Sequence, residues 1–376
     1  MLFVALLAAC GSSDPNVPST NTPLLAATAA PTRTPSPSPR LGEGSSTPSA
    51  AAQTPPPAVP TRPPAPAGVS ITISAVGDIS LAREVVPRME ANGAGYPYAL
   101  ITHLIDGDIA FANLEGALTD RGDPWPKGYN FRTPPRFASG LRDVGFDVVS
   151  LANNHTMDYG EVGLLDTIAA LAGAGVRPVG AGADAVAAAT PAIIEANGLR
   201  VAFVACVATP TEAGGFSIGQ WSATLHAPGV FVCEEPALTA AIGAARNAAD
   251  FVIVTAHAGA EYRNLPDATQ ARIANAALAA GADAFIGHHA HVVQPVELRG
   301  AQLVAWGLGN FIFDLDSVDL ANIPVPRVSL ILNITLTKGA GVTSFEAIPV
   351  TQDAAEDRPR PATPEEAAIL QRLITP

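Results

Sequence analysis

Polar side chains of the kinds that bind metal ions recur in this sequence, each time just after a predicted strand. Carboxylate, amide and imidazole groups suit zinc, manganese or iron, and none of these segments contains a cysteine. Because sites in open α/β sheets form at the carboxyl ends of the strands, we expect these side chains to meet at one edge. The segments are Gly77-Asp78, Asn113-Leu114-Glu115-Gly116, Asn153-Asn154-His155 with Asp158, His257–Tyr262, Gly287–His291 and Gly309-Asn310-Phe311.

Five of the seven histidines fall in these segments, and three of them stand within His288–His291. Three histidines in four residues seldom pack into a core without a reason. His289 and His291 are two residues apart, so both imidazoles can face one site from a turn. A lone Gly-Asp or Asn-His pair is as often structural as functional, whereas the whole set predicts a functional site. We interpret His103 and His226 as ordinary surface or packing residues.

The elements that must position these segments alternate between strand and helix from residue 69 onward. Val69–Val76 is the first predicted strand and ends at Gly77-Asp78. Repeated strand–helix alternation predicts an α/β layer fold. Further strands are expected at Asp108–Ala112, Asp147–Leu151, Arg200–Val207, Phe251–Ala256 and Asp283–Gly287, and helices near Tyr98–Ile105, Pro134–Val144, Val162–Ala174, Pro236–Ala248 and Ala268–Ala280.

Late in the chain the pattern changes to strands without long helices between them. We expect antiparallel pairs that close a second sheet, and one short helix that begins at Pro364 in the tail. The expected late strands are Val292–Leu298, Gln302–Trp306, Val328–Thr337 and Val342–Val350.

The start of the chain predicts a lipid-anchored protein. Leu7-Ala8-Ala9-Cys10-Gly11 follows an apolar run and has the form of a bacterial lipobox, in which the peptide is cut before Cys10 and the thiol is acylated. No Lys or Arg precedes the run, so we expect the true start codon upstream. The alternative is an apolar tail with a chance cysteine. We expect an extracytoplasmic protein, anchored to the cell membrane through Cys10.

A linker separates this anchor from the predicted domain. Residues 12–68 hold 15 of the chain's 35 prolines and no aromatic residue, so they cannot bury enough surface to offset chain entropy. We expect residues 1–11 to form the signal and lipobox, residues 12–68 a disordered linker, residues 69–355 one domain and residues 356–376 a tail.

Charge and cysteine content limit the function further. The formal net charge is −13, and the linker is slightly basic, so the acidic excess lies in the domain and argues against nucleic-acid binding. An acidic polymer would need a local basic or metal-bearing cleft. Cys206 and Cys233 both lie in apolar surroundings, and we expect two separate buried thiols, with a disulfide as the alternative.

Taken in order, the motifs resemble those of the CapA family, the poly-γ-glutamate capsule biosynthesis proteins, whose domain is related to calcineurin-like metallophosphatases. The resemblance runs from about Val69 to about Val350. It is carried by Gly77-Asp78 with Arg83, Asn113–Gly116, Leu151–Gly160, His257–Tyr262, Gly287–His291 and Gly309–Phe311, and by the connecting segments Lys127–Arg132 and Ala172–Val176.

This resemblance implies a four-layer α/β/β/α sandwich of metallophosphatase type with two divalent metal ions, manganese, zinc or iron. Two ions about 3.5–4 Å apart can clamp a phosphate and lower the pKa of a bound water. The implied ligands are Asp78 and His291 on the first metal, Glu115 between the two, and Asn154, His257 and His289 on the second.

The resemblance also implies His155 as the proton donor to the leaving oxygen. The further catalytic candidates are Asp158 and Glu261, and the residues expected to contact an anionic substrate are Arg83, Asn113, Lys127 and Arg132.

Three positions depart from the family pattern. Ser80 stands where metallophosphatases have a histidine, which leaves the first metal with fewer protein ligands. Ala258 and Ala290 stand where most members have Trp and Pro.

Three functions fit these observations to different degrees. The first is a metal-dependent hydrolase that acts on a phosphoester or an acidic polymer, which His155 favours. The second is a capsule or envelope assembly protein that binds the polymer, or synthase subunits that make it, without turnover, which Ser80 and the acidic domain favour. A solute-binding lipoprotein is disfavoured, because a simple binder has little use for the histidine cluster.

Overall fold

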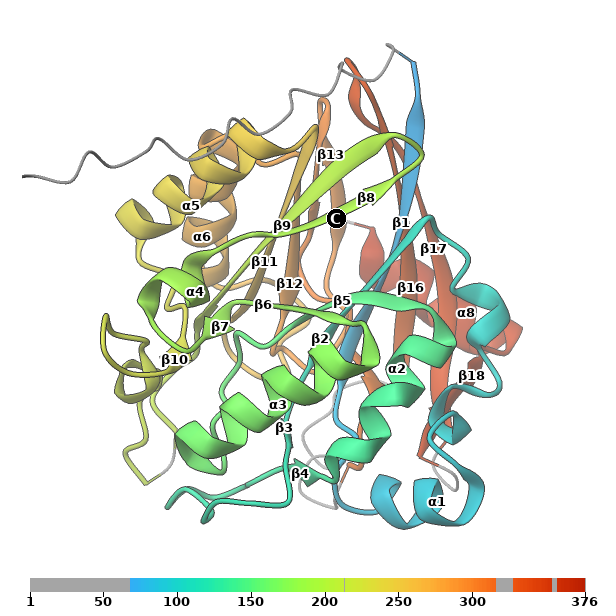
Figure 1. Ribbon diagram of the computed structural model, residues 1–376. Helices are drawn as coiled ribbons and strands as arrows, with labels where there is room; N and C mark the ends of the chain where they lie inside the picture. Colours follow the sequence, from blue (N-terminus) through green and yellow to red (C-terminus); the bar gives the residue numbers. More distant parts are fainter. Residues whose placement is uncertain (1–67, 213, 316–326, 354–356, 376) are drawn as a thin grey trace, which may run out of the picture. The chain divides into compact units, whose positions relative to one another are not determined.

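The computed structural model describes residues 68–212, 214–315, 327–353 and 357–375 (Figure 1). The predicted lipobox with Cys10, and the predicted linker up to residue 67, lie outside the described residues. Within the described part of the chain, no helix is both long and apolar enough to cross a membrane.

The first of two large sheets runs in the order β18-β17-β16-β1-β2-β5-β6, and β15 pairs with the end of β1. The pairs β1–β2, β2–β5 and β5–β6 are parallel, whereas β16, β17 and β18 are added antiparallel on the other side of β1. The strands are β1 (Ser70–Ile79), β2 (Ile109–Leu114), β5 (Phe146–Ser150), β6 (Arg177–Val179), β15 (Asn310–Ile312), β16 (Val328–Thr337), β17 (Gly341–Asp353) and β18 (Arg358–Pro361).

The second sheet runs in the order β13-β14-β12-β11-β9-β8, with parallel pairs in its centre and an antiparallel strand at each edge. Its strands are β8 (Ala192–Ala196), β9 (Leu199–Ala208), β11 (Phe251–Ala258), β12 (Ala284–His288), β13 (Val296–Arg299) and β14 (Gln302–Ala305). Two small ladders join β3 (Ala117–Leu118) to β4 (Arg132–Thr133) and β7 (Ala181–Gly182) to β10 (Gly229–Val230).

Local signals in the sequence explain where the helices begin and end. Asp267 and Gln270 form a capping box at the start of α6, and Thr363 and Glu366 form one at the start of α8. A left-handed glycine, Gly175, ends α3. The helices are α1 (Val85–Asn92), α2 (Ala138–Val144), α3 (Gly160–Ala174), α4 (Ala185–Ala189), α5 (Glu235–Ala248), α6 (Ala268–Ala279) and α8 (Pro364–Ile374).

The main core lies between the two sheets. Phe111 of β2 stacks on Phe203 of β9, with 5.4 Å between ring centroids. The alternate side chains of β9, such as Val204, join a second core beneath α5 and α6. Figure 1 shows α5 and α6 beside β9, β11 and β12, and α2 and α3 beside β5 and β6. The layer order is α/β/β/α, which confirms the predicted fold class.

Two predicted features of the fold are wrong. The stretch predicted as a helix, Tyr98–Ile105, forms parts of two short 3₁₀ turns, Tyr96–Tyr98 and Thr102–Leu104. The buried side chains Tyr98 and Ile101 are three residues apart, which is the 3₁₀ period. The late strands also do not all close the second sheet, because β16 and β17 extend the first sheet along the open edge of β1.

The cysteine interpretation needs correction as well, because Cys206 and Cys233 form a disulfide, with 5.0 Å between their Cα atoms. The segment after β10 runs beside the end of β9, where the Cys233 amide donates to the Val207 carbonyl at 3.0 Å. This pairing joins residues 27 positions apart, and neither local apolar run reveals it.

We predict that Gly77→Ala destabilises the protein by at least about 1–3 kcal/mol, because the added Cβ would lie 1.9 Å from the Gly309 carbonyl oxygen. Gly243→Ala is the matched control, since it stands mid-helix in α5 with no atom within 4 Å and should stabilise by roughly 0.5–1 kcal/mol. Urea denaturation measures both, and equal effects would refute the close approach at Gly77.

We also predict that Cys206→Ala/Cys233→Ala lowers the free energy of unfolding by about 3–4 kcal/mol, the chain-entropy value for a closed loop of 27 residues. Denaturation of the oxidised wild type and the double variant tests this. A reducing agent should lower the stability of the wild type and leave that of the variant unchanged.

Candidate metal centre

The strand registers bring the predicted ligands together at the carboxyl ends of both sheets. In the first sheet, Asp78 of β1 lies opposite Asn113 of β2 and opposite Asn310 of β15. In the second sheet, His257 of β11 lies opposite His288 of β12. A register shift in β1, between Ala75 and Asp78, sets the first of these alignments.

One set of donor atoms surrounds the His257 imidazole. Its Nε2 lies 2.9 Å from Asn154 Oδ1, 3.1 Å from His289 Nδ1 and 3.7 Å from Glu115 Oε1. Ligands around a tetrahedral ion with bonds of about 2.0–2.1 Å are themselves roughly 3.3 Å apart. The spacing and chemistry of these four donors therefore fit a divalent metal ion.

Glu115 is a buried carboxylate whose charge a bound ion would compensate. It is 1% exposed, and neither carboxylate oxygen has a hydrogen-bond partner. Burial, followed by the nearby charges of Asp78 and Glu261, raises the pKa of Glu115 well above its usual value. A buried carboxylate without partners is costly, and a bound cation would compensate its charge.

Asp78 lies in the opposite electrostatic situation. Burial by itself would raise its pKa, but the hydrogen bond with His288 and the charges of His288 and His291 outweigh burial and lower it. His288 Nδ1 lies 2.9 Å from Asp78 Oδ1, and Asn113 donates to the same oxygen at 2.9 Å. Asp78, Glu115 and His257 each present a donor atom within 4.8 Å of the others.

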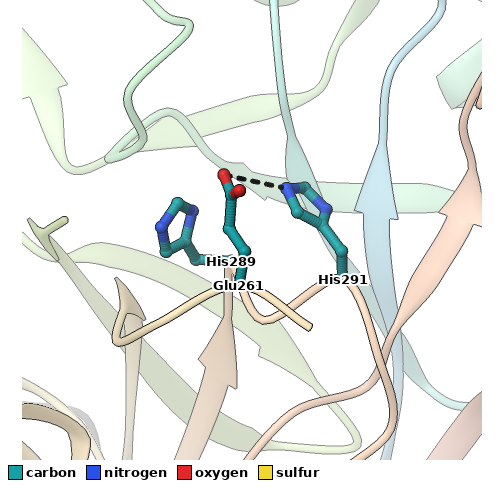
Figure 2. Close-up of side chains that lie close together, drawn as sticks. All are labelled: Glu261, His289 and His291. Atoms are coloured by element: carbon teal, nitrogen blue, oxygen red, sulfur yellow. Dashed lines mark ion pairs between the residues drawn. The ribbon is translucent and has the colours of Figure 1, made fainter. Parts of the chain in front are cut away.

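The turn after β12 presents His289 and His291 to the same region. Both residues have positive φ, 83° and 56°, a conformation that costs about 1–3 kcal/mol and clusters at functional sites. Figure 2 shows the Glu261 carboxylate between the two imidazoles, with Oε1 4.0 Å from His291 Nε2. Asn310 Oδ1 lies 2.8 Å from His291 Nδ1, which leaves Nε2 to face the centre.

Two imidazoles of the centre, those of His257 and His289, have lowered pKa values that favour the neutral form required for metal binding. Burial, followed by the charge of His291, lowers the pKa of His289 to about 3. Burial and then the charges of His289 and His291 lower the pKa of His257 well below its usual value.

His155 lies at the edge of this cluster. Its Nε2 is 3.8 Å from Glu115 Oε1, and its Nδ1 is 2.8 Å from Asp158 Oδ2. Its ring stacks on Phe131, with centroids 4.1 Å apart. Burial lowers the pKa of His155 more than the charge of Asp158 raises it. Asp158 holds the imidazole at Nδ1, and Nε2 points toward the metal ligands.

A pocket of about 570 Å³ opens over the cluster, and His155, His289, His291 and Glu261 contribute to its lining. Arg83 also lines it, and its Nε lies 3.2 Å from Asp314 Oδ2.

The other three residues predicted to contact substrate lie elsewhere. Asn113 is fully buried between Asp78 and His257. The Lys127 side chain has no exposed surface. Arg132 stacks on the ring of Tyr159 and donates to the carbonyls of residues 121 and 122.

Three contributors were not predicted as site residues. His288 holds Asp78, Asn310 orients His291, and Glu212 accepts a hydrogen bond from Asn154 at 2.8 Å. The sequence carried a signal for the first two, because both lie in the strand-end motifs. Glu212 lies in a long connection without such a signal. Ser80, at the position of the missing histidine, is buried.

Residues 72–315 match the model of a family described as bacterial capsule synthesis protein PGA_cap. The chain is 31% identical over 308 residues to the PGA biosynthesis protein CapA of Bacillus subtilis (strain 168), covering 81% of this chain and 76% of the relative. It is 32% identical over 257 residues to the capsule biosynthesis protein CapA of Bacillus anthracis, covering 65% of this chain and 60%, less than two thirds, of that relative.

Two solved structures are also similar. One is a putative 5'-nucleotidase from Staphylococcus aureus in complex with alpha-ketoglutarate, with a TM-score of 0.46, 15% identity, and coverage of 81% of this chain and 58% of that chain. The other is a phosphatase from Mycoplasma pneumoniae, with a TM-score of 0.46, 13% identity, and coverage of 82% and 100%.

We predict that Glu115→Gln abolishes metal binding yet makes the metal-free protein more stable at high pH. The raised pKa means that the folded wild type binds a proton more tightly than the unfolded chain. Its stability therefore falls as pH rises above the usual value of 4.5, until the folded pKa is passed. The Gln variant lacks this loss. Denaturation in chelator at several pH values measures the difference, and a constant difference would contradict it.

Proposed function

The chain belongs to the bacterial capsule synthesis protein family, and we propose that it serves the biosynthesis or assembly of a poly-γ-glutamate capsule or related envelope polymer through a metal-dependent phosphoesterase site. The relatives named as CapA support the biological role. The convergence of Glu115 with His257, Asn154 and His289 supports the chemistry and is the observation that carries the proposal.

The donor set suits two divalent ions held by the ligands named from the sequence. Asp78, Glu115 and His291 would hold the first ion, and Glu115, Asn154, His257 and His289 would hold the second. His288 hydrogen-bonds to Asp78 and orients this carboxylate, while Ser80 leaves the first ion with fewer protein ligands than the metallophosphatase pattern provides. When bound, such ions polarise a phosphoryl group and supply a nucleophilic water at neutral pH.

The protein's own residues then handle the proton. The free edge of His155 faces the pocket, so protonated Nε2 can donate to the leaving oxygen while Asp158 stabilises the imidazolium from behind. Glu261, half-exposed in the lining of the same pocket beside His291, is the second catalytic carboxylate in this proposal.

The pocket constrains the substrate. Among the described residues, Arg83 is the one Lys or Arg that lines the pocket, beside the carboxylates of Glu212 and Glu261. The rings of Tyr129 and Phe313 also line it. Such a pocket suits a single phosphoester or the anionic end of a polymer, held by the centre and by Arg83. A long polyanion would meet like charges there.

We further propose an extracytoplasmic protein with the anchor at Cys10, a linker over residues 12–68, the domain over 69–355 and the tail over 356–376. The disulfide Cys206–Cys233 supports an oxidising compartment.

The experiment that tests the activity is phosphodiesterase and phosphomonoesterase assay of the metal-loaded protein beside metal analysis. We predict that His155→Ala keeps its metal and loses roughly 10²–10⁴-fold in turnover, the usual value of general acid catalysis. His289→Ala and Glu115→Ala should lose metal, because each removes a ligand.

Loss of metal from His155→Ala equal to that from His289→Ala would make His155 a ligand instead. A wild type that holds no metal and hydrolyses no ester would favour the alternative, a non-catalytic envelope protein that binds the polymer.

A further inference from the structure

Lys127 is a cation enclosed beside the candidate proton donor. Its side chain has no exposed surface, and its Nζ lies 2.9 Å from Asp158 Oδ1 and 3.7 Å from Glu212 Oε1. Removing an ammonium group from water costs several kcal/mol unless partners compensate it. Because the Lys127 side chain is fully buried, its ammonium group does not reach the pocket and does not contact substrate.

Aromatic rings complete the enclosure. Nζ lies 5.1 Å from the ring centroid of Phe216 and 4.9 Å from that of Trp221, both within cation–π range. Trp125 stands edge-on to both rings. These three rings form a cage around Nζ. Trp125 comes from the connection that carries Lys127, and Phe216 and Trp221 come from the connection after β9.

The same ammonium group contacts the turn that carries His155. It donates to the carbonyl oxygen of Asn154 and lies 3.4 Å from His155 Nδ1. The Asp158 carboxylate is shared between the two neighbours, because Oδ1 faces Lys127 while Oδ2 faces His155 Nδ1. Lys127 therefore touches both the backbone before His155 and the carboxylate behind it.

We propose that Lys127 is a positioning residue, which fixes the Asp158 carboxylate and the Asn154–His155 turn so that His155 Nε2 faces the leaving group. This inference rests on the proposed phosphoesterase function. In that reaction the oxygen of water bonds to phosphorus, and the P–O bond to the leaving group breaks with its electron pair on the leaving oxygen. That oxygen takes the Nε2 proton, and a proton given up by the water restores the imidazolium.

If Lys127 acts in this way, the loss of kcat on its replacement depends on the leaving group. An alkoxide needs the proton, whereas 4-nitrophenolate leaves without it. We predict that Lys127→Met lowers kcat by at least 10²-fold for an alkyl phosphoester but less than 10-fold for the 4-nitrophenyl ester, within the usual range of general acid catalysis. KM and metal content should change less than about 3-fold.

Lys338→Met is the matched control. Lys127 and Lys338 are the chain's two lysines, and Lys338 also pairs with a partly buried aspartate, Asp250. Asp250 precedes β11, at the opposite end of this strand from His257. This variant should lower stability without changing the ratio of the two rates.

Equal losses with both esters, or a raised KM with unchanged kcat, would overturn the proposal. If Lys127→Met does not fold, Lys127→Arg replaces it. This variant keeps the charge, but its longer side chain and planar guanidinium cannot reproduce the contacts of a compact ammonium group, so the alkyl rate must still fall selectively. Restoration of the alkyl rate of Lys127→Ala by added propylamine, which matches the side-chain atoms that this substitution removes, is a further expected result, and its absence in a folded variant counts against the proposal.

A measurement that does not depend on turnover separates the positioning role of Lys127 from the proposed phosphoesterase function. In the metal-free protein, ¹⁵N NMR of the His155 ring should show one tautomer with Nδ1 protonated toward Asp158, and Lys127→Met should give a mixture. A wild type that hydrolyses neither ester refutes the proposed function but not the positioning. An unchanged tautomer in Lys127→Met refutes the positioning itself.

Discussion

The centre of this protein depends on a buried carboxylate that nothing in the described chain neutralises directly. Glu115 lies within 4 Å of three imidazole nitrogens, those of His155, His257 and His291, yet hydrogen-bonds to none of them. Burial suppresses protonation of His257, so this ring does not supply a compensating charge. A buried, unpaired carboxylate destabilises an ordinary core but is suited to bind a cation. The surrounding structure holds Glu115 in this position.

That support comes from the two sheets. Parallel registers at the carboxyl ends place Asp78, Asn113 and Asn310 on one side and His257 and His288 on the other. Each side chain is then held by a polar neighbour, so the donor atoms keep their directions before any ion arrives. Such preorganisation lowers the cost of assembling a metal site from separate segments.

A second group of ordered contacts lies behind His155. The Asp158 carboxylate links His155 to the enclosed Lys127, and aromatic side chains from the connection after β9 cover that lysine. The disulfide Cys206–Cys233 closes the same connection. The loop that provides Glu212 to the pocket wall is therefore tied both to the sheet and to the turn that carries His155.

Much of this organisation was visible in the sequence. Strand–helix alternation predicted an α/β layer fold, and helices α3, α5 and α6 lie where it placed them, while the family resemblance implied the four layers. The recurrence of Asp, Asn and His after strands predicted which segments meet, because the ends of parallel strands share an edge whatever the exact register. The capping residues Thr363 and Glu366 act locally, which is why the tail helix was predictable from Pro364.

The tertiary structure alone decided which atoms meet. His288 pairs with Asp78 across 210 positions, and Lys127 is enclosed by rings from residues about 90 positions away. Such contacts depend on register, on the packing of two sheets and on the left-handed turn at His289, none of which leaves a periodic pattern in the chain. For the same reason the disulfide and the place of β16 and β17 in the first sheet were mispredicted. A local pattern reports which face of an element is apolar, whereas the partner that covers this face is chosen by the free energy of the whole fold.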